Sequence, residues 1–434
     1  MHLYTLFQQH PVISTDSRIC TQGSLFFALK GDNYNANSLA IKALENGCSY
    51  AVIDEPEYAI DNRFIVVDNV LESLQQLALY HRKQLATKIL GITGSNGKTT
   101  TKELIAAVLK EKYNTHFTQG NLNNHIGVPL TLLQLKPEHE IAIIEMGANR
   151  PGDIKLLAEI TRPDYGIITN VGKAHLEGFG SFEGVMNTKA ELYDFIAQNG
   201  KLIFINSGNP FLNEMAKKSK LNKEQQTVEF QISESNDIPA YSGRIENNSP
   251  FLQMKCCTKA GTVFDVQTRL IGTYNAENIQ AAVVIGNYFG LTDEEIKQGL
   301  EKYQPSNNRS QLTETESNKL IVDAYNANPT SMTAAVLNFA HMQVENKTLI
   351  LGDMLELGEY SRNEHQTIVD LLTQQHFNSV FLVGSAFKQT TNNFQCFENV
   401  NGVINFLEIN PVKNNFVLIK GSRGIQLEKV IASL

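Results

Sequence analysis

The segment GITGSNGKTTT, residues 91–101, has the residue types of a phosphate-binding loop. An apolar run at 89–93 precedes it, and a helical pattern begins near Lys98. Glycines let the backbone approach phosphate, amides at a helix start bind its oxygens, and Lys98 can reach the outer phosphates. The Thr99 hydroxyl can hold Mg²⁺. The strict motif G-x-x-x-x-G-K-[ST] has its first glycine at the position of Ile92, so this loop is a tighter variant. The loop alone does not indicate which reaction the bound phosphate undergoes.

Four further side chains could act on a bound phosphate or nucleotide. Glu145 ends the apolar run 141–144, where an acid in a P-loop sheet faces Mg²⁺. His175 follows a strand pattern and could complete a second Mg²⁺ site, although Mg²⁺ prefers oxygen. Arg309 could move onto a γ-phosphate, and Asp323 at a strand end could accept from a ribose hydroxyl. On sequence alone, each could instead be an ordinary polar residue, and Asp323 could cap a turn.

The apolar pattern that must position these residues divides the chain into three zones, 1–85, 86–305 and 306–434. The first has short apolar runs at 25–29, 50–53 and 64–67 and helical stretches at 38–46 and 71–85, which predicts a small α/β domain.

The second zone alternates strand patterns with helical ones, which predicts a parallel, doubly wound sheet. Its strand candidates are 89–93, 141–146, 165–170 and 201–205. Several short strands over 227–271 predict an antiparallel extension, followed by a helix over 276–288.

A polar linker, 304–309, leads into the third zone. Strand candidates there alternate with helices and predict a second, Rossmann-like α/β domain. They are 320–324, 348–351, 380–383 and 416–419.

Composition limits the class of protein. At roughly 150 residues per domain, 434 residues favour about three domains. The net charge of -8 argues against a general nucleic-acid-binding surface but allows a local basic pocket. Five cysteines without C-x-x-C spacing favour a reduced, cytoplasmic protein. The N-terminus lacks the pattern of an export signal, and no apolar run approaches the ~18 residues of a membrane span.

Seven segments, taken in order, resemble the Mur ligases, and the resemblance extends over residues 15–424. The segments are GITGSNGKTTTKE, TQGNLNNHIGVPLTLL, EMGANRPGDI, NVGKAHLEGFGS, DAYNANPTSM, LGDMLELG and KGSRG. It implies a small N-terminal domain for a UDP-linked substrate, a central P-loop ATPase domain with a parallel sheet, and a C-terminal Rossmann-like domain. YNANP and LGDMLELG are most similar to members that add D-alanyl-D-alanine to a UDP-N-acetylmuramoyl-tripeptide.

The resemblance implies ATP-driven amide-bond formation in peptidoglycan precursor synthesis. The tripeptide carboxylate attacks the γ-phosphate to give an acyl phosphate, and the dipeptide amine then displaces phosphate. Carboxylate is a poor acylating group, so the enzyme mainly positions the reactants and neutralises clustered negative charge. ATP and two Mg²⁺ are the expected cofactors. The tripeptide nucleotide and the dipeptide are the expected partners, with no nucleic acid, no membrane span and a monomeric chain.

The resemblance also assigns roles by position. Residues matching the ATP, metal and γ-phosphate contacts are Gly94, Ser95, Asn96, Gly97, Lys98, Thr99, Thr100, Glu145, His175, Asn278 (adenine), Arg309 and Asp323 (ribose). Lys189, whose helical pattern alone predicts a solvent-exposed lysine, matches the family's carbamylated lysine and second Mg²⁺ ligand. Residues matching the uridine-diphosphate end are Thr15, Asp16, Ser17, Arg18, Ser24 and Phe26. Those near the incoming dipeptide are Tyr325, Asn326, Asn328 and Pro329.

The chain departs from the family pattern at two places. Residues 31–37 read GDNYNAN where D-G-H is usual, which leaves the sugar contacts of this loop open. Tyr274 precedes Asn275 where the family often has histidine, so that adenine contact is absent or replaced by aromatic stacking.

Three alternatives compete with the D-alanyl-D-alanine-adding activity. They are a Mur ligase adding the third amino acid, a folylpolyglutamate-type ligase and a P-loop switch protein. The sequence has no N-K-x-D guanine signature, and a ligase better explains the third α/β zone. The third residue of the tripeptide, lysine or diaminopimelate, is not fixed by the sequence.

Overall fold

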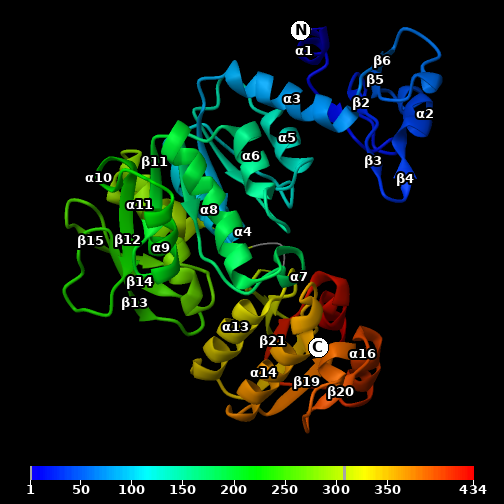
Figure 1. Cartoon of the computed structure of the whole chain (residues 1–434). Coiled ribbons are helices and arrows are strands. Elements are labelled where there is room, and N and C mark those ends of the chain that lie inside the picture. The colour runs from blue at the N-terminus through cyan, green and yellow to red at the C-terminus, as the bar shows by residue number, and fades with distance from the viewer. Residues whose placement is uncertain (1, 306–308) are drawn as a thin grey trace.

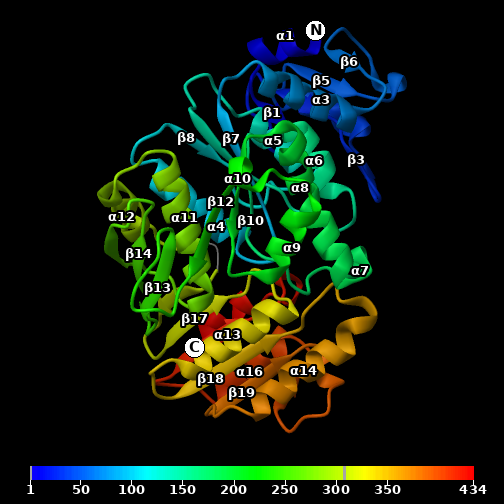
Figure 2. The ribbon, with the colours of Figure 1, turned by 60° about the vertical axis from the view of Figure 1, so that its left-hand side comes forward.

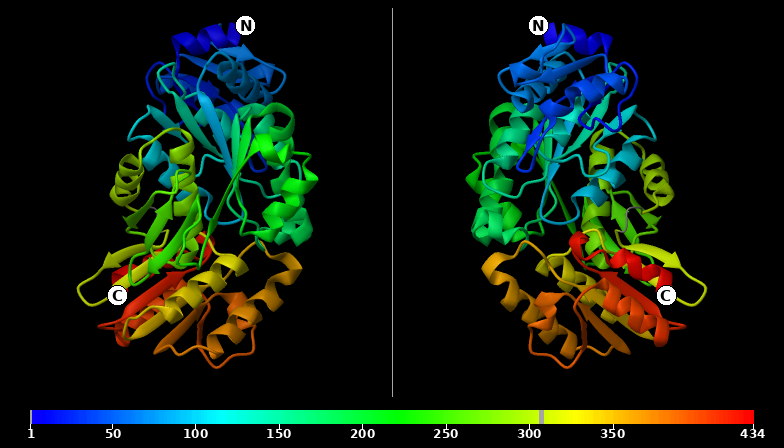
Figure 3. Two further views of the ribbon diagram at one scale, coloured as in Figure 1. Left: turned by 90° about the vertical axis from the view of Figure 1, so that its left-hand side faces the viewer. Right: turned by 90° about the vertical axis from the view of Figure 1, so that its right-hand side faces the viewer.

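The computed structural model describes residues 2–305 and 309–434, and three main sheets follow one another along the molecule (Figure 1). The first sheet lies at one end and the third at the other, with the nine-stranded sheet between them (Figure 3). The expected three-part α/β architecture is therefore confirmed. Within the predicted linker 304–309, residues 306–308 lie outside the described part of the chain.

The first sheet is parallel, in the order β1-β2-β5-β6. Its strands are β1 (Ile13–Ser14), β2 (Leu25–Phe27), β5 (Tyr50–Ile53) and β6 (Phe64–Val66). A small hairpin joins β3 (Lys30–Gly31) to β4 (Tyr34–Asn35), and the helices are α1 (His2–Gln9), α2 (Ala40–Glu45) and α3 (Val70–Lys83). The Asn69 side chain caps α3 by accepting from the Glu72 amide. Helix α3 lies between the first sheet and α5 of the next (Figure 2).

The second sheet has the order β15-β14-β13-β12-β11-β10-β7-β9-β8. Its strands are β7 (Lys88–Thr93), β8 (Thr115–Phe117), β9 (Ile141–Glu145), β10 (Tyr165–Ile168), β11 (Leu202–Asn206), β12 (Thr227–Ile232), β13 (Ser242–Asn247), β14 (Gln253–Cys257) and β15 (Val263–Gln267). The helices of this part are α4 (Lys98–Leu109), α5 (Gly127–Leu132), α6 (Asp153–Thr161), α7 (Leu176–Phe179), α8 (Phe182–Asn199), α9 (Pro210–Lys218), α10 (Lys223–Gln226), α11 (Ala276–Tyr288) and α12 (Asp293–Lys302).

Strand β9 shows how this sheet is buried on both faces. Ile141 and Ile143 join the core formed with α4, α11 and α12, whereas Ala142 and Ile144 join the core formed with α5, α6 and α8. Successive side chains of a strand point to opposite faces, so an uninterrupted apolar run suits a strand covered on both sides.

The prediction of an antiparallel extension over 227–271 is only partly right. Strands β12 and β13 continue the sheet in parallel, whereas β14 and β15 are antiparallel. The links 248–252 and 258–262 are short enough for hairpins, but β12 follows helices α9 and α10, a crossover that a parallel strand requires.

The third sheet has the order β16-β17-β21-β18-β19-β20, and only its edge strand β16 is antiparallel. Its strands are β16 (Gln311–Glu314), β17 (Lys319–Asp323), β18 (Lys347–Gly352), β19 (Ser379–Val383), β20 (Gln395–Phe397) and β21 (Phe416–Lys420). Its helices are α13 (Pro329–His341), α14 (Ser361–Thr373), α15 (Ser385–Lys388) and α16 (Val400–Ile409). The four predicted strands are present, and β16 and β20 extend them at the edges.

No helix in the described ranges is long and apolar enough to cross a membrane.

Candidate active site

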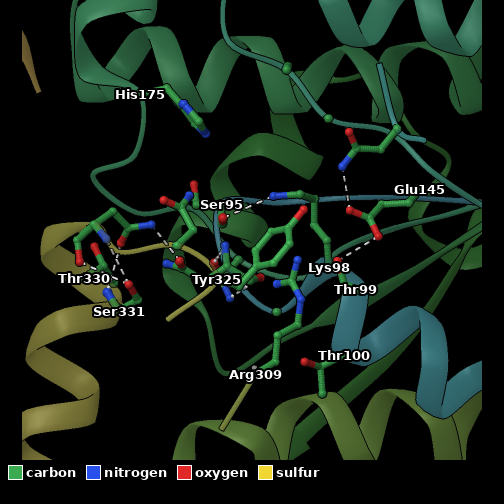
Figure 4. Close-up of a pocket in the computed structure, with 18 of the residues that line it drawn as sticks. Ser95, Lys98, Thr99, Thr100, Glu145, His175, Arg309, Tyr325, Thr330 and Ser331 are labelled. Atoms are coloured by element: carbon green, nitrogen blue, oxygen red, sulfur yellow. Dashed lines mark hydrogen bonds between the residues drawn. The ribbon is translucent and has the colours of Figure 1, made fainter. Parts of the chain in front are cut away.

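A cleft of about 980 Å³ lies where the second and third sheets meet. Its walls come from segments after β7, β9 and β10 on one side and after β17, β18 and β21 on the other. The carboxyl ends of parallel strands are the usual ligand-binding edge of an α/β sheet. Two such edges therefore face each other across one cavity, and Figure 4 shows residues that line it.

The predicted phosphate loop runs from the end of β7 into α4. A side chain on Gly94 (φ +145°) would meet Thr169 Oγ1 at 2.0 Å, and one on Gly97 (φ +76°) would meet Asn278 Oδ1 at 2.8 Å. Both positions therefore require glycine. The first hydrogen bond into the helix runs from the Thr101 amide to Gly97 O, which leaves the amides of the first turn directed at the cleft.

Lys98 begins α4 and folds back over the loop. Its ammonium donates to Gly94 O at 2.6 Å and to Ser95 O at 3.2 Å. Burial lowers the pKa of Lys98, the charge of Glu145 opposes this, and the charge of Arg309 lowers it further. These contacts hold the Lys98 ammonium over the concave turn of the loop. A positive charge in that position suits the binding of an anion by the loop.

Glu145 is 1% exposed at the end of β9 and is held from several sides. One carboxylate oxygen accepts from Thr99 Oγ1 at 2.9 Å, and the other accepts from Asn123 Nδ2 at 2.7 Å (Figure 4). The Lys102 ammonium lies 3.6 Å from the same carboxylate. The structure thus brings together Thr99 and Glu145, the two residues predicted to hold the first Mg²⁺.

His175 caps the short helix α7 and lines the cleft at some distance from the phosphate loop (Figure 4). Its Nδ1 contacts the carboxylate of Glu356, which lies in the segment after β18. The His175 contact lowers the pKa of Glu356. The contact fixes the imidazole ring and links the second sheet to the third.

Lys189 lies inside α8 and is 2% exposed, so the prediction of a solvent-exposed lysine from its helical pattern alone is wrong. Its ammonium lies 5.3 Å from the centre of the Phe179 ring. Burial, together with the positive charge of Lys98, lowers the pKa of Lys189 to about 7. A large fraction of this amine is therefore neutral near pH 7.

Arg309 packs its guanidinium 3.8 Å from the centre of the Tyr325 ring (Figure 4). The next residue, Ser310, shares a 2.8 Å hydrogen bond with the Tyr274 hydroxyl. Tyr274, which replaces the expected histidine, therefore ties the second sheet to the start of the third zone and also lines the cleft.

The other predicted nucleotide contacts lie at the same cleft. Asp323, at the end of β17, accepts a 2.6 Å hydrogen bond from the buried ammonium of Lys420. Asn278 accepts from Thr101 Oγ1 at 2.9 Å and donates to Asn275 at 2.8 Å. These partners fix the orientation of both polar groups.

The YNANP segment touches the phosphate loop directly. Asn328 caps α13 through a capping box with Ser331. The side-chain Nδ2 of Asn328 donates to Asn96 Oδ1 at 2.7 Å. Asn326 lines the same wall. Of the residues predicted for ATP, metal or dipeptide, the cleft is lined by Ser95, Asn96, Gly97, Lys98, Thr99, Thr100, Glu145, His175, Asn278, Arg309, Asp323, Tyr325, Asn326 and Asn328. Gly94, Lys189 and Pro329 are not among the residues that line it.

The residues predicted for the uridine-diphosphate end do not line this cleft. Arg18 is exposed and forms a forked pair with Asp16. Ser24 and Phe26 are fully buried, and Ser24 Oγ lies 3.2 Å from Cys48 Sγ. Thr15 and Ser17 complete this loop.

Loop 31–37, which differs from the family pattern, has a structural role in the first sheet. The buried Asn37 donates to Asn35 and Asp54, and the Asp54 amide donates back to Asn37. Lys30 pairs with Asp54 and Glu55 at 2.9 and 2.8 Å.

Sequence reasoning missed several residues of the cleft, notably Asn123, Arg150, Glu356, Lys420 and Arg423. Lys420 ends β21, the other four lie in segments that follow strands, and all five are in motifs already singled out for resemblance. Strand-end position within those motifs was the signal that could have identified them.

Comparisons with known proteins agree with this geometry. Residues 92–286 match the Mur ligase middle domain, and residues 308–423 match the Mur ligase, glutamate ligase domain. The UDP-N-acetylmuramoyl-tripeptide–D-alanyl-D-alanine ligases of Bacillus subtilis and Escherichia coli are each 33% identical over 97% of this chain, covering 92% and 93% of those proteins.

Solved structures give the same result. MurF from Acinetobacter baumannii superposes with a TM-score of 0.84 at 32% identity, over 97% of this chain and 92% of that one. The MurF ligase from Thermotoga maritima, crystallised in complex with ADP, gives a TM-score of 0.85 at 25% identity, over 99% of this chain and 97% of that one. The chain belongs to the Mur ligase family.

Proposed function

We propose that the chain joins D-alanyl-D-alanine to a UDP-N-acetylmuramoyl-tripeptide, consuming ATP, in the synthesis of a peptidoglycan precursor. The observation that carries this proposal is the meeting of two strand-end walls at one cleft. One wall carries the phosphate loop, and the other carries YNANP and LGDMLELG. The relatives that are at least 30% identical over nearly the whole chain carry this activity in their names.

The phosphate end of the cleft fits ATP. The free amides at the start of α4 and the ammonium of Lys98 can neutralise the β- and γ-phosphates. Arg309 can approach the γ-phosphate, because it lines the same cleft as Lys98. Asn278 and Asp323 are available for adenine and ribose.

The donor set also fits Mg²⁺. Glu145 is a buried carboxylate hydrogen-bonded to the Thr99 hydroxyl, and both groups offer oxygen, the ligand type that Mg²⁺ prefers. No cluster of three or more His, Cys, Asp or Glu suited to a metal lies within residues 2–305 and 309–434. Phosphate oxygens and water would complete the coordination of the ion, as is usual for Mg²⁺. When bound, the metal would offset the charge of the phosphates during transfer.

We place a second cation between His175 and Lys189. The low pKa of Lys189 leaves a neutral amine that can react with CO₂, and the resulting carbamate supplies anionic oxygen. This assignment accounts for a buried lysine within reach of the positive charge of Lys98, which is otherwise an unfavourable position for a second positive charge.

In the proposed reaction, the residues of the cleft support two steps, phosphoryl transfer and then amide-bond formation. The tripeptide carboxylate oxygen bonds to the γ-phosphorus as the bond to ADP breaks, while Lys98 and Arg309 offset the developing charge. The dipeptide amine next bonds to the acyl carbon, and the tetrahedral adduct expels phosphate through C–O cleavage. The amine loses its extra protons to solvent in forming the amide. Closure of the two walls holds the reactants together and excludes water.

The reaction uses nucleotide substrates of the cytoplasm, and we place the chain there as a monomer. We further propose that 1–85, 86–305 and 306–434 are its three domains and that residues 15–18, with the segment around Ser24 and Phe26, bind the UDP end.

The direct test is release of ADP and phosphate by the purified chain. We expect release only when ATP, Mg²⁺, UDP-N-acetylmuramoyl-tripeptide and D-alanyl-D-alanine are all present. Equal release with D-alanyl-D-alanine omitted, or with a single amino acid in its place, would reject the proposal. Comparing the lysine and diaminopimelate tripeptides identifies the preferred third residue.

A further inference from the structure

We infer that Arg423 binds the terminal carboxylate of the incoming dipeptide and thereby selects a free acid at that end. This inference rests on the proposed function, because it assigns a contact to one of the substrates. Arg423 follows β21 at the third-sheet side of the cleft, and its side chain is exposed there.

Two cations of the cleft belong to the phosphate end. Lys98 donates to carbonyls of the phosphate loop. Arg309 lies near enough to Lys98 for its charge to act on that lysine. The proposed function assigns both to the phosphates of ATP.

Two further cations are balanced by carboxylates of the protein. Arg150 pairs with Asp153 at 3.4 Å, and Lys420 pairs with Asp323 at 2.6 Å. Arg423 has no ion pair with any described residue, although it lines the same cleft. Its guanidinium is thus a basic group available for an anionic ligand, as is that of Arg309, which packs against the same Tyr325 ring and is assigned to the phosphates.

The backbone before Arg423 is held rigidly. The Ser422 amide donates to Asp353 O at 3.1 Å, the Leu355 amide donates to Ser422 Oγ at 3.0 Å, and that hydroxyl lies 3.3 Å from Ala327 O. Three segments of the third sheet therefore fix the base of the side chain. Its guanidinium lies 5.5 Å from the centre of the Tyr325 ring, which forms an adjacent part of the wall.

The chemistry of the substrates selects the dipeptide carboxylate as the partner. The reacting carboxylate of the tripeptide must reach the γ-phosphate, and the ATP phosphates lie at the loop with Lys98. Two residues span at most about 7 Å, so a dipeptide whose amine is at the reaction centre keeps its carboxylate inside the cleft. A guanidinium binds a carboxylate through two parallel hydrogen bonds, which also fixes the direction of the dipeptide.

The test compares D-alanyl-D-alanine with its C-terminal amide as acceptor in the full reaction. We expect wild type to prefer the acid by roughly 10- to 100-fold in kcat/KM, as for a charge-assisted hydrogen bond. Arg423→Gln should reduce this preference to less than about threefold, chiefly through KM for the acid. KM for ATP and for the tripeptide nucleotide should stay within about twofold of wild type. Arg423→Lys should restore part of the preference.

Arg362→Gln is the matched control, because Arg362 is an exposed arginine of α14 outside the cleft. It should keep the wild-type preference. An unchanged acid preference in Arg423→Gln would overturn the inference, and so would a rise confined to KM for ATP. Failure of wild type to ligate either acceptor would instead reject the proposed function.

Discussion

Lys98 is the residue whose charge the phosphate loop depends on most directly. We expect Lys98→Ala to reduce the ligation rate by roughly 10³-fold, about 4 kcal/mol of barrier, because the transferring phosphoryl group loses its nearest cation. The fold should persist, since alanine favours the helix that begins there. Steady-state ADP release and thermal unfolding measure the two effects.

Lys155→Ala, at an exposed position of α6, is the control and should ligate at the wild-type rate. Turnover close to wild type by a folded Lys98→Ala protein would show that the loop does not bind the reacting phosphates.

Lys189 gives the second prediction at this scale. We expect Lys189→Ala to lose most activity and to regain part of it with added formate or acetate, because a small carboxylate can occupy the oxygen positions of the carbamate. The wild-type chain, equilibrated with ¹³C-bicarbonate, should show a carbamate carbon resonance that the variant lacks. Full activity of the variant without carboxylate would refute the role.

Residue types and spacing predicted the loop glycines, and Glu145 and Asp323 as strand-end groups. In the structure, Gly97, Glu145 and Asp323 line one cleft, and Gly94 has the positive φ that the loop requires. The burial of Lys189 could not be predicted in this way, because a lone lysine in a helical pattern gives no sign of what packs over it. The same holds for Arg423, whose availability depends on which other cations find partners.

Strand β8 and helix α5 provide a test at the scale of elements. His116 of β8 lies with its Nε2 3.2 Å from Thr131 O in α5, and its ring centre is 5.0 Å from that of His139. Burial, with the neighbouring His139 and Lys110, lowers the pKa of His116 to about 4, although the Thr131 contact opposes the shift. The folded chain therefore holds this imidazole neutral well below its usual range.

The sign of the pH effect follows from this shift. Below about pH 6.5 the unfolded chain binds a proton that the folded chain does not, so stability falls as pH decreases towards 4. We expect His116 to account for a loss on the order of 2 kcal/mol between pH 7.5 and 5. Urea unfolding of His116→Gln should show a correspondingly smaller loss. His341→Gln, at an exposed site, should keep the wild-type pH slope; an identical slope for His116→Gln would contradict the assignment.

At this scale, apolar patterning was most successful for strands buried on both faces and for the helix at 276–288, which α11 occupies over its full predicted length. It failed on the direction of β12 and β13. Direction depends on the path of the connection, and short apolar runs bounded by turn residues look alike in parallel and antiparallel sheets.

Across the whole molecule, small polar contacts hold the third sheet against the second. The Lys173 ammonium lies 2.6 Å from the Glu364 carboxylate of α14, and the Lys173 amide donates to Thr330 Oγ1 at 3.1 Å. The Tyr360 hydroxyl donates to Gly180 O at 3.4 Å. Because such contacts are individually weak, we expect the third domain to move relative to the second and to close when nucleotide and UDP-substrate bind. Unchanged small-angle scattering on adding both ligands would contradict this.

The Lys173–Glu364 pair allows that motion to be tested by charge reversal. Half of the Lys173 side chain is exposed, so the pair itself contributes little, but Lys173→Glu replaces attraction with repulsion across the closing surface. We expect the closed population to fall by up to about fivefold, with a larger radius of gyration and a KM for ATP raised by a similar factor. Adding Glu364→Lys to Lys173→Glu should restore both quantities, because the pair is then re-formed with its charges exchanged. If the double reversal behaves like the single one, the effect of Lys173→Glu comes from damage to its own loop and not from the contact between the domains.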